Sequence, residues 1–518
     1  MSEAVVVDRG TFLGHPKGLY VLFFAEMWER FSFYGMRGLL IFYLTQHFLF
    51  SDRVATGIYA TYGSLVYLMP LVGGIIADRY LGFRKAIVFG AILLCLGHLG
   101  MAFEGAPAVM TAGEVVRDQS SLQVFYFSMA FIIMGVGFLK PNISGIVGQL
   151  YTDGDPRRDG GFTIFYMGIN FGAMTSAIFC GYLGQTYGWS YGFGLAGIGM
   201  LLGLITFIRW RDLYAGAGEP SNPERLKEPF LGPVNREWFI YLCGIAGIVV
   251  AWQLMQNREI VGNILLVATA IVVVGVTGFS VLRCTPVERN RMLVVLFLTA
   301  VSVVFWAFFE QAGSSMSLFT ERNVDRNLFG LNVLSSQLQF FNPGYILLFA
   351  PVFASLWLWL SKRGWEPSTP AKFGLGIVQV GLGFGALVMG ANSATVDGSV
   401  ALYWLALAYL LHTTGELCLS PVGLSMVTRF SVPSMVGLMM GVWFLASSLA
   451  HYVAGLIAAG ASVESVPGEV IDKVASLAVY SNTFGYLAKV AVAVGVVVLV
   501  IAPLLNRYLH VDHEANNN

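Results

Sequence analysis

The chain has 518 residues, of which 56% are hydrophobic and only 12% are charged, and its formal net charge is zero. Soluble domains carry about 25% charged residues, so this composition excludes an ordinary soluble protein and indicates one that crosses a membrane many times. The neutral charge balance gives no electrostatic reason to expect a nucleic-acid partner.

Runs of about 20 apolar residues are long enough to cross a bilayer as helices. About fourteen such runs follow one another here, which predicts an all-α membrane protein. A proline-rich polar linker, Arg209 to Arg236, follows the sixth run, and a hinge, Arg283 to Arg291, follows the eighth. We therefore expect a six-helix bundle over residues 1–210, a linker and an inserted helix pair over 211–290, and a second six-helix bundle over 291–518.

The loops alternate in their content of Lys and Arg, which predicts their orientation because basic loops stay in the cytoplasm. The basic loops include Arg79, Arg84 and Lys85, the linker after the sixth run, and Lys362 with Arg363. This pattern places both termini on the cytoplasmic side. Residues 1–15 lack the features of a cleavable signal peptide, so the first apolar run is expected to direct insertion.

The first run carries four charges, Glu26, Glu29, Arg30 and Arg37, in an otherwise apolar sequence. A charge at mid-membrane depth costs about 2.5–3.5 kcal/mol on insertion scales. At helical spacing the four side chains share one face with Tyr34. A substrate anion that draws Arg30 away would leave the carboxylates readier to take up a proton, which couples the two ligands. A purely structural ion-pair network is the alternative.

The second run ends in Gly73-Gly-Ile-Ile-Ala-Asp-Arg-Tyr-Leu-Gly-Phe-Arg-Lys85. This segment resembles the loop between helices two and three of the major facilitator superfamily. Two groups of six helices also suit a transporter built from repeats, with its substrate site between the halves near the membrane midplane.

Lys140 lies deep in the fourth run and directly before Pro141, which disfavours helical geometry at the lysine. A lysine at such an irregularity suits recognition of a carboxylate, and snorkelling to the interface is the alternative. In the fifth run, Tyr166 and Asn170 share a helix face, with glycines that allow close approach. That asparagine is expected either to contact substrate or to bond another helix.

The second half has polar and aromatic side chains at helical spacing or beside a proline: Trp306 with Glu310, Asn342 beside Pro343, Glu416, and Trp443 with Ser447. Facing Arg30 and Lys140, Glu310 and Glu416 would make a cavity positive on one side and negative on the other. A zwitterion with separated ends fits that field. The expected aromatic lining comprises Tyr34, Tyr67, Tyr166, Trp306 and Trp443.

Other polar residues of the apolar runs are expected to be structural. His98 and His451 have no carboxylate at helical spacing, and His412 lies four residues before Glu416. The five cysteines have no metal-ligand spacing, so no metal site is expected. No motif of an enzyme and no pore-lining repeat of one residue type appears, which disfavours an enzyme and a channel.

Several of these segments together resemble one family. Glu26-Met-Trp-Glu-Arg-Phe-Ser-Phe-Tyr-Gly resembles the helix-one motif ExxERFxYY of the proton-dependent oligopeptide transporter (POT/PTR) family. Lys140-Pro-Asn-Ile-Ser, the block from Phe165 to Gly172 and Gly415-Glu-Leu-Cys-Leu-Ser-Pro421 resemble its other motifs. The helix pair near 237–282 is similar to the extra pair of bacterial members.

This resemblance implies the major facilitator fold, with two six-helix bundles and two inserted helices. It implies proton-coupled uptake of di- and tripeptides by alternating access across the cytoplasmic (inner) membrane. The protein is expected to be a monomer in membrane lipid without a cofactor, the proton being the coupling ion. The nearest rival is a proton symporter for a non-peptide solute such as nitrate. Glu310 and Glu416 argue against a simple anion because they would oppose it.

The resemblance also implies roles for single residues. Arg30 and Lys140 would contact the peptide carboxylate. The amino terminus would meet Asn170, Asn342 and Glu416, and the pocket lining would be Tyr34, Tyr67, Tyr166, Trp306, Trp443 and Ser447. Proton coupling would involve Glu26, Glu29, Arg30 and Glu310, and an Arg37–Glu310 ion pair would form a gate.

The sequence departs from the family pattern at two positions. Phe33 stands where the pattern has a tyrosine, so any contact of that hydroxyl is lost. Ala60 stands where some members carry a histidine in the second helix. A histidine relay at position 60 is therefore excluded, which puts more weight on the acids of the first helix.

Overall fold

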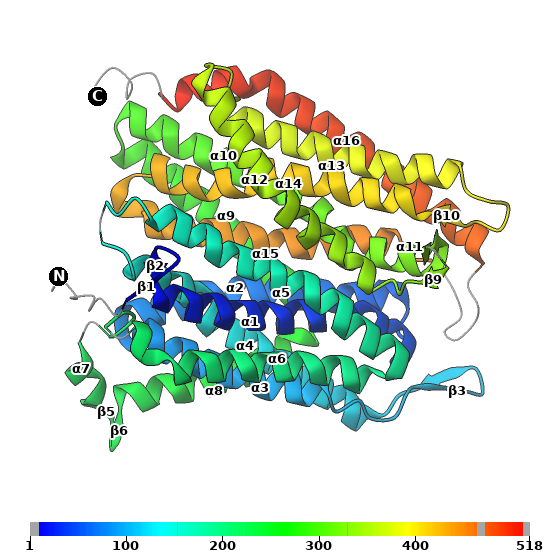
Figure 1. The fold of residues 1–518 in the computed structure, drawn as a ribbon, viewed down its shortest axis with the longest axis horizontal. Coiled ribbons are helices and arrows are strands. Elements are labelled where there is room, and N and C mark those ends of the chain that lie inside the picture. Colours follow the sequence, from blue (N-terminus) through cyan, green and yellow to red (C-terminus); the bar gives the residue numbers. More distant parts are fainter. Residues whose placement is uncertain are drawn as a thin grey trace. The chain divides into compact units, whose positions relative to one another are not determined.

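The computed structural model describes residues 10–510 apart from 153, 215, 221, 329 and 464–471. The protein is mostly helical (Figure 1). The described long helices are α1 (Lys17–Phe42), α2 (Asp52–Ile76), α3 (Phe83–Met101), α4 (Gln119–Gln149), α5 (Arg158–Tyr187), α6 (Trp189–Arg209), α8 (Arg236–Met255), α9 (Arg258–Arg283), α10 (Pro286–Phe309), α12 (Phe341–Lys362), α13 (Thr369–Asn392), α14 (Leu402–Phe430), α15 (Val436–Gly460) and α16 (Lys473–Tyr508). The two chain ends, predicted to be cytoplasmic, lie outside the described residues.

Shorter elements accompany these long helices. They are the helices α7 (Pro223–Lys227) and α11 (Ser315–Asn323) and the strands β1 (Thr11–Phe12), β2 (His15–Pro16), β3 (Val109–Thr111), β4 (Glu114–Val116), β5 (Pro229–Leu231), β6 (Val234–Asn235), β7 (Val324–Asp325), β8 (Asn327–Leu328), β9 (Leu331–Asn332) and β10 (Val400–Ala401). Among the described residues, four antiparallel hairpins form, β1–β2, β3–β4, β5–β6 and β8–β9, whereas β7 and β10 pair in parallel.

Twelve of the long helices are apolar enough to cross a membrane by length and composition. Helices α1 and α14 are long enough but more polar, because α1 holds the buried charged cluster and α14 holds Glu416 among other polar residues. Adding these two to the twelve gives fourteen, as predicted. The prediction of an all-α membrane protein is confirmed, and its two most polar long helices carry predicted site residues.

The chain forms two compact units. The first comprises Met1–Leu49, Leu65–Arg258 and Ser336–Pro343, and the second comprises Phe50–Ser64, Glu259–Ser335 and Gly344–Asn518. The inserted helix pair is divided between them, since α8 belongs to the first unit and α9 to the second. These two units do not correspond one to one with the three predicted segments. The division into 1–210, 211–290 and 291–518 therefore remains a prediction.

Side-chain caps define where several helices begin. The Asp118 carboxylate accepts a hydrogen bond from the Ser120 amide at the start of α4. Thr285 and Glu288 form a reciprocal capping box at the start of α10, with Pro286 in the first helical turn. These residues satisfy amide groups that a helix terminus otherwise leaves without partners.

Glycines set the packing of the first unit. A Cβ at Gly172 of α5 would lie 2.2 Å from the Met27 carbonyl oxygen of α1, so only glycine fits there. Gly168, one turn earlier, faces the Phe23 ring in the same way. The close approach predicted for this stretch of the fifth helix is thus confirmed, and its partner is the charged helix α1.

The apolar run that follows the hinge Arg283 to Arg291 is interrupted in the structure. Helix α10 ends at Phe309, a 3₁₀ turn covers Glu310–Gly313, and α11 begins at Ser315. Ser314 leaves helical geometry, with φ −128° and ψ −95°. Gln311 holds this joint against α15 by donating to the Ala454 carbonyl at 3.0 Å. Glu310 therefore lies at a break between two helices.

Candidate functional site

The charges of α1 form a buried cluster in the first unit. Arg30 Nε lies 3.0 Å from Glu26 Oε1 and also pairs with Glu29. All three residues are at most 3% exposed. Within the described residues, Glu29 Oε1 and Arg30 Nη2 have no hydrogen-bond partner. Buried polar groups without partners are costly. A proton on the carboxylate oxygen or an anion at the guanidinium would therefore stabilise this cluster.

Phe33, where the family pattern has a tyrosine, contacts the same arginine. The Arg30 guanidinium carbon lies 5.3 Å from the centre of the Phe33 ring, within the range of a cation–π interaction. The residue is 2% exposed. Losing the hydroxyl therefore does not remove this side chain from the cluster, since its ring faces the cation.

Lys140 of α4 joins the cluster electrostatically. Its ammonium lies 4.0 Å from the centre of the Tyr67 ring. Its charge interacts with Glu26, Glu29, Arg30 and Arg37 of α1, and Tyr34 and Tyr67 interact with Arg30. The structure thus brings together seven predicted residues of one unit: Glu26, Glu29, Arg30, Tyr34, Arg37, Tyr67 and Lys140.

The predicted irregularity at Lys140 is wrong, because α4 runs as one helix through Pro141. Close packing overrides the local preference of the proline. Pro141 has no amide hydrogen, so the Gly137 carbonyl oxygen has no helical donor. Gly73 of α2 packs closely against this oxygen, since a Cβ there would lie 2.1 Å from it. The Asn142 side chain donates to the neighbouring Phe138 carbonyl at 2.6 Å.

Tyr166 and Asn170 lie one turn apart on α5, also in the first unit. The Asn170 amide donates to the Tyr166 carbonyl at 3.0 Å, and the asparagine is 5% exposed. Asn342 lies in the first turn of α12, in the short segment that belongs to the first unit. Pro343 beside it does not break the helix, because a proline in the first turn loses no helical hydrogen bond.

In the second unit, Glu310 has a histidine neighbour. His451 Nδ1 of α15 lies 3.6 Å from Glu310 Oε2, and the side chains are 6% and 7% exposed. Trp306, one turn before Glu310, packs edge-on against Phe305 and Phe309. Helical spacing reveals only neighbours within one helix. It therefore does not reveal this contact, because the two residues are far apart in the chain.

The remaining predicted residues lie on α14 and α15. Gly415 and Gly376 of α13 approach each other so closely that a Cβ on either would lie within 2.8 Å of the other's carbonyl oxygen. This contact fixes the helix that carries Glu416. The Trp443 ring covers Gly423 of α14, and the Ser447 hydroxyl donates to the Trp443 carbonyl at 3.1 Å. That the two units face each other across one cavity remains a prediction.

A polar cluster that was not predicted from the sequence links three helices of the second unit. Arg322 donates to both carboxylate oxygens of Asp52 at 2.6 and 2.7 Å and to the Tyr480 hydroxyl at 2.8 Å. The Val463 amide donates to Asp52 as well, at 3.1 Å. A bidentate pair of this kind is geometrically specific. It ties the start of α2 to α11 and α16.

A bundle of membrane helices with a buried, incompletely satisfied ion cluster defines a membrane transporter. Comparison with known proteins agrees. The family model described as "PTR2: POT family" matches residues 84–471. The peptide transporter YePEPT of Yersinia enterocolitica is 35% identical, covering 86% of this chain and 88% of its own. The dipeptide and tripeptide permease A of Erwinia pyrifoliae is 32% identical, covering 95% and 94%.

The structure is also similar to that of a mutant of peptide transporter POT solved in complex with alafosfalin. The TM-score is 0.80 at 32% sequence identity, and 98% of each chain is covered. The protein therefore belongs to the POT family, as its sequence motifs predicted, and it has the all-α membrane fold of the major facilitator type.

Proposed function

We propose that this protein takes up di- and tripeptides together with protons across the cytoplasmic membrane. The observation that carries the proposal is the cluster of Glu26, Glu29 and Arg30, buried in α1 beside Lys140. Arg30 and Lys140 balance the charges of Glu26 and Glu29 without a ligand, and Arg37 is assigned to the gate with Glu310. Adding a peptide carboxylate calls for one more positive charge, and a proton supplies it.

In this mechanism Arg30 and Lys140 bind the carboxylate end of the peptide. As Arg30 turns to the substrate, Glu26 and Glu29 lose part of their pairing and take up a proton. Asn170, Asn342 and Glu416 bind the amino terminus. The side-chain pockets are lined by Tyr34, Tyr67, Tyr166, Trp306, Trp443 and Ser447, which offer broad apolar surfaces with few fixed hydrogen bonds.

Glu310 acts in the second unit as a proton-coupling residue, and with Arg37 it forms a gate that opens when the glutamate is protonated. Its place at the joint between α10 and α11 supports this role, because a charge change at a helix break can alter the angle of the break. The protein works as a monomer in the inner membrane, with both termini in the cytoplasm and no cofactor.

Uptake into proteoliposomes tests the function. With an inward proton gradient, labelled dialanine is expected to accumulate, and an ionophore that collapses the gradient is expected to abolish accumulation. Excess unlabelled dipeptide should compete and nitrate should not. Accumulation that survives the ionophore would refute proton coupling, and competition by nitrate alone would identify a non-peptide solute.

The Glu29→Gln variant tests the cluster itself. It is expected to lose proton-driven uptake while retaining most peptide exchange at equal pH on both sides, because exchange needs no net proton movement. Glu224→Gln on α7, where the carboxylate is 80% exposed, is the matched control and should behave as the wild type. If Glu29→Gln lowers both activities alike, Glu29 is a structural residue.

A further inference from the structure

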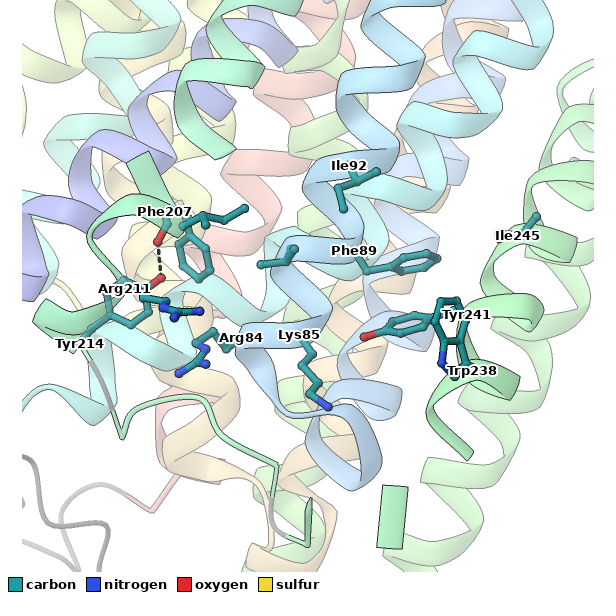
Figure 2. A pocket seen from close by; sticks show the side chains of 12 residues that line it. Arg84, Lys85, Phe89, Ile92, Phe207, Arg211, Tyr214, Trp238, Tyr241 and Ile245 are labelled. Carbon is teal, nitrogen blue, oxygen red and sulfur yellow. Dashed lines mark hydrogen bonds between the residues drawn. The ribbon is translucent and has the colours of Figure 1, made fainter. Parts of the chain in front are cut away.

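A groove opens on the surface of the first unit between α3, α6 and α8, with a volume of about 490 Å³ (Figure 2). Helix α8, the first of the inserted pair, supplies one wall through Trp238, Tyr241 and Ile245. Ile92 and Ile208 belong to the walls from α3 and α6. All three helices lie within one compact unit.

The walls of this groove are apolar and exposed. Ile92 and Ile208 are each 44% exposed, Ile245 is 50% exposed and Trp238 is 63% exposed. On a membrane helix, exposed aliphatic surface is solvated by acyl chains. Trp and Tyr are enriched where the hydrocarbon meets the headgroups. The groove thus has the lining of a lipid site, with its aromatic residues near one end.

The same end of the groove is basic. Figure 2 shows Arg84, Lys85 and Arg211 together below Phe89 and Ile92. Arg84 pairs with Glu219 and Lys85 with Glu237, whereas Arg211 has no ion-pair partner among the described residues. These three cations line the groove, and no carboxylate is among the described residues that line it, although Glu219, Glu237 and Asp212 lie beside them.

The ion pairs at this end remain open to solvent. The side chain of Glu219 is 44% exposed and that of Lys85 is 38% exposed. Surface ion pairs of this kind contribute little stability and exchange partners readily. Arg84, which is 29% exposed, can therefore turn toward a phosphate by giving up one partly exposed ion pair, and Arg211 gives up none.

Two neighbouring grooves of the same unit show that the basic end is specific. A groove of about 380 Å³ at the opposite end of α8, bounded by Leu96, Phe127 and Trp252, has no charged lining residue. A third groove, of about 470 Å³ between α1 and α6, contains one cation, Lys17. Apolar grooves of this size thus recur on the first unit. Of these three grooves, only the one between α3, α6 and α8 is also lined by three cations.

We propose that the groove between α3, α6 and α8 binds an anionic phospholipid, with its phosphate at Arg211, Arg84 and Lys85 and an acyl chain along Ile92 and Ile245. The Lys and Arg bias of the loops assigns this end to the cytoplasmic leaflet. Basic pockets between membrane helices on that side characteristically hold anionic lipid headgroups. This site is separate from the ion cluster of α1 and gives the inserted helix α8 a role: it completes a lipid site.

Thermal unfolding of the purified full chain in detergent tests the proposal. Phosphatidylglycerol is expected to raise the melting temperature by several degrees more than phosphatidylcholine with the same acyl chains. Arg211→Gln should remove at least half of that difference, and Ile92→Trp, which fills the groove, should also reduce it. Lys17→Gln is the matched control in the neighbouring groove and should keep the full difference.

Native mass spectrometry supplies a second measurement that does not depend on stability. The wild type and Lys17→Gln should retain phosphatidylglycerol, and Arg211→Gln should retain less of it. Inorganic phosphate at the same concentration should leave the melting temperature unchanged, which separates a lipid site from an ion site. Equal effects of the two lipids, a stabilisation by phosphate alone, or equal losses in Arg211→Gln and Lys17→Gln would overturn the proposal.

Discussion

Glu310 and His451 lie side by side in the second unit, with 3.6 Å between the carboxylate oxygen Oε2 and the imidazole nitrogen Nδ1. The first is at the joint between α10 and α11, and the second is on α15. From α2, Gly63 leaves room for the ring, since a Cβ there would lie 2.8 Å from Nδ1. A proton on either of these two groups changes the charge that the other one meets.

This pairing makes a first prediction. In His451→Asn the carboxylate of Glu310 loses a neighbour that is cationic when protonated, so the pH dependence of peptide uptake is expected to change while the protein still folds. The measurement is the initial rate of dipeptide uptake into proteoliposomes across external pH values from 5 to 8, the range in which histidine ordinarily titrates. Gly63→Ala should change the profile similarly, because it displaces the ring.

His98→Asn is the control for this experiment. His98 is also fully buried, but it lies on α3 in the first unit, and neither ring nitrogen has a hydrogen-bond partner within the described residues. Its variant should keep the wild-type pH profile. If both histidine variants change the profile equally, the effect comes from removing any buried histidine and not from the neighbour of Glu310.

The second prediction concerns Phe33. Phe33→Leu removes the ring that faces Arg30 and is expected to destabilise the protein by about 2 kcal/mol, the size of a desolvated cation–π contact. Phe33→Tyr restores the family pattern, keeps the ring face and should stay near wild-type stability. Unfolding in detergent measures both variants. Equal stability of Phe33→Leu and wild type would show that the 5.3 Å contact contributes nothing.

The third prediction concerns Asp52 and Arg322. Asp52→Asn leaves a mostly buried guanidinium without its counter-charge, and breaking such a pair costs about 3–5 kcal/mol. Tyr480→Phe removes only one hydrogen bond and should cost about 0.5–1.5 kcal/mol. If the two variants lower stability equally, the ion pair is not the main contact of this cluster. The double variant Asp52→Asn, Arg322→Gln should recover part of the loss.

The sequence predicted what lies within one helix and missed what lies between helices. Glu26, Glu29 and Arg30 share a face by their spacing, and the structure joins them. The contact of His451 with Glu310 depends on which helices pack together, which no periodicity in one segment can reveal. The uninterrupted course of α4 through Pro141 has the same origin, because the local preference of a proline was outweighed by packing on α2.

The last prediction tests whether the fit of α1 against α5 positions the ion cluster. In Gly172→Ala the new methyl group would lie 2.2 Å from the Met27 carbonyl, so the two helices must separate. Overpacking of this kind costs about 1–3 kcal/mol. Since Glu26 and Arg30 flank Met27 on α1, peptide uptake should fall by more than the loss of folded protein explains.

Gly278→Ala on α9 is the matched control for that variant. Nothing lies within 4 Å of a Cβ at Gly278, and alanine is the better helix former, so this change should leave uptake unaltered and should not lower stability. Uptake rates normalised to the folded protein measured by size-exclusion chromatography separate the two effects. If Gly172→Ala transports as well as Gly278→Ala once normalised, the cluster tolerates a shift of α1, and its function does not depend on this close approach.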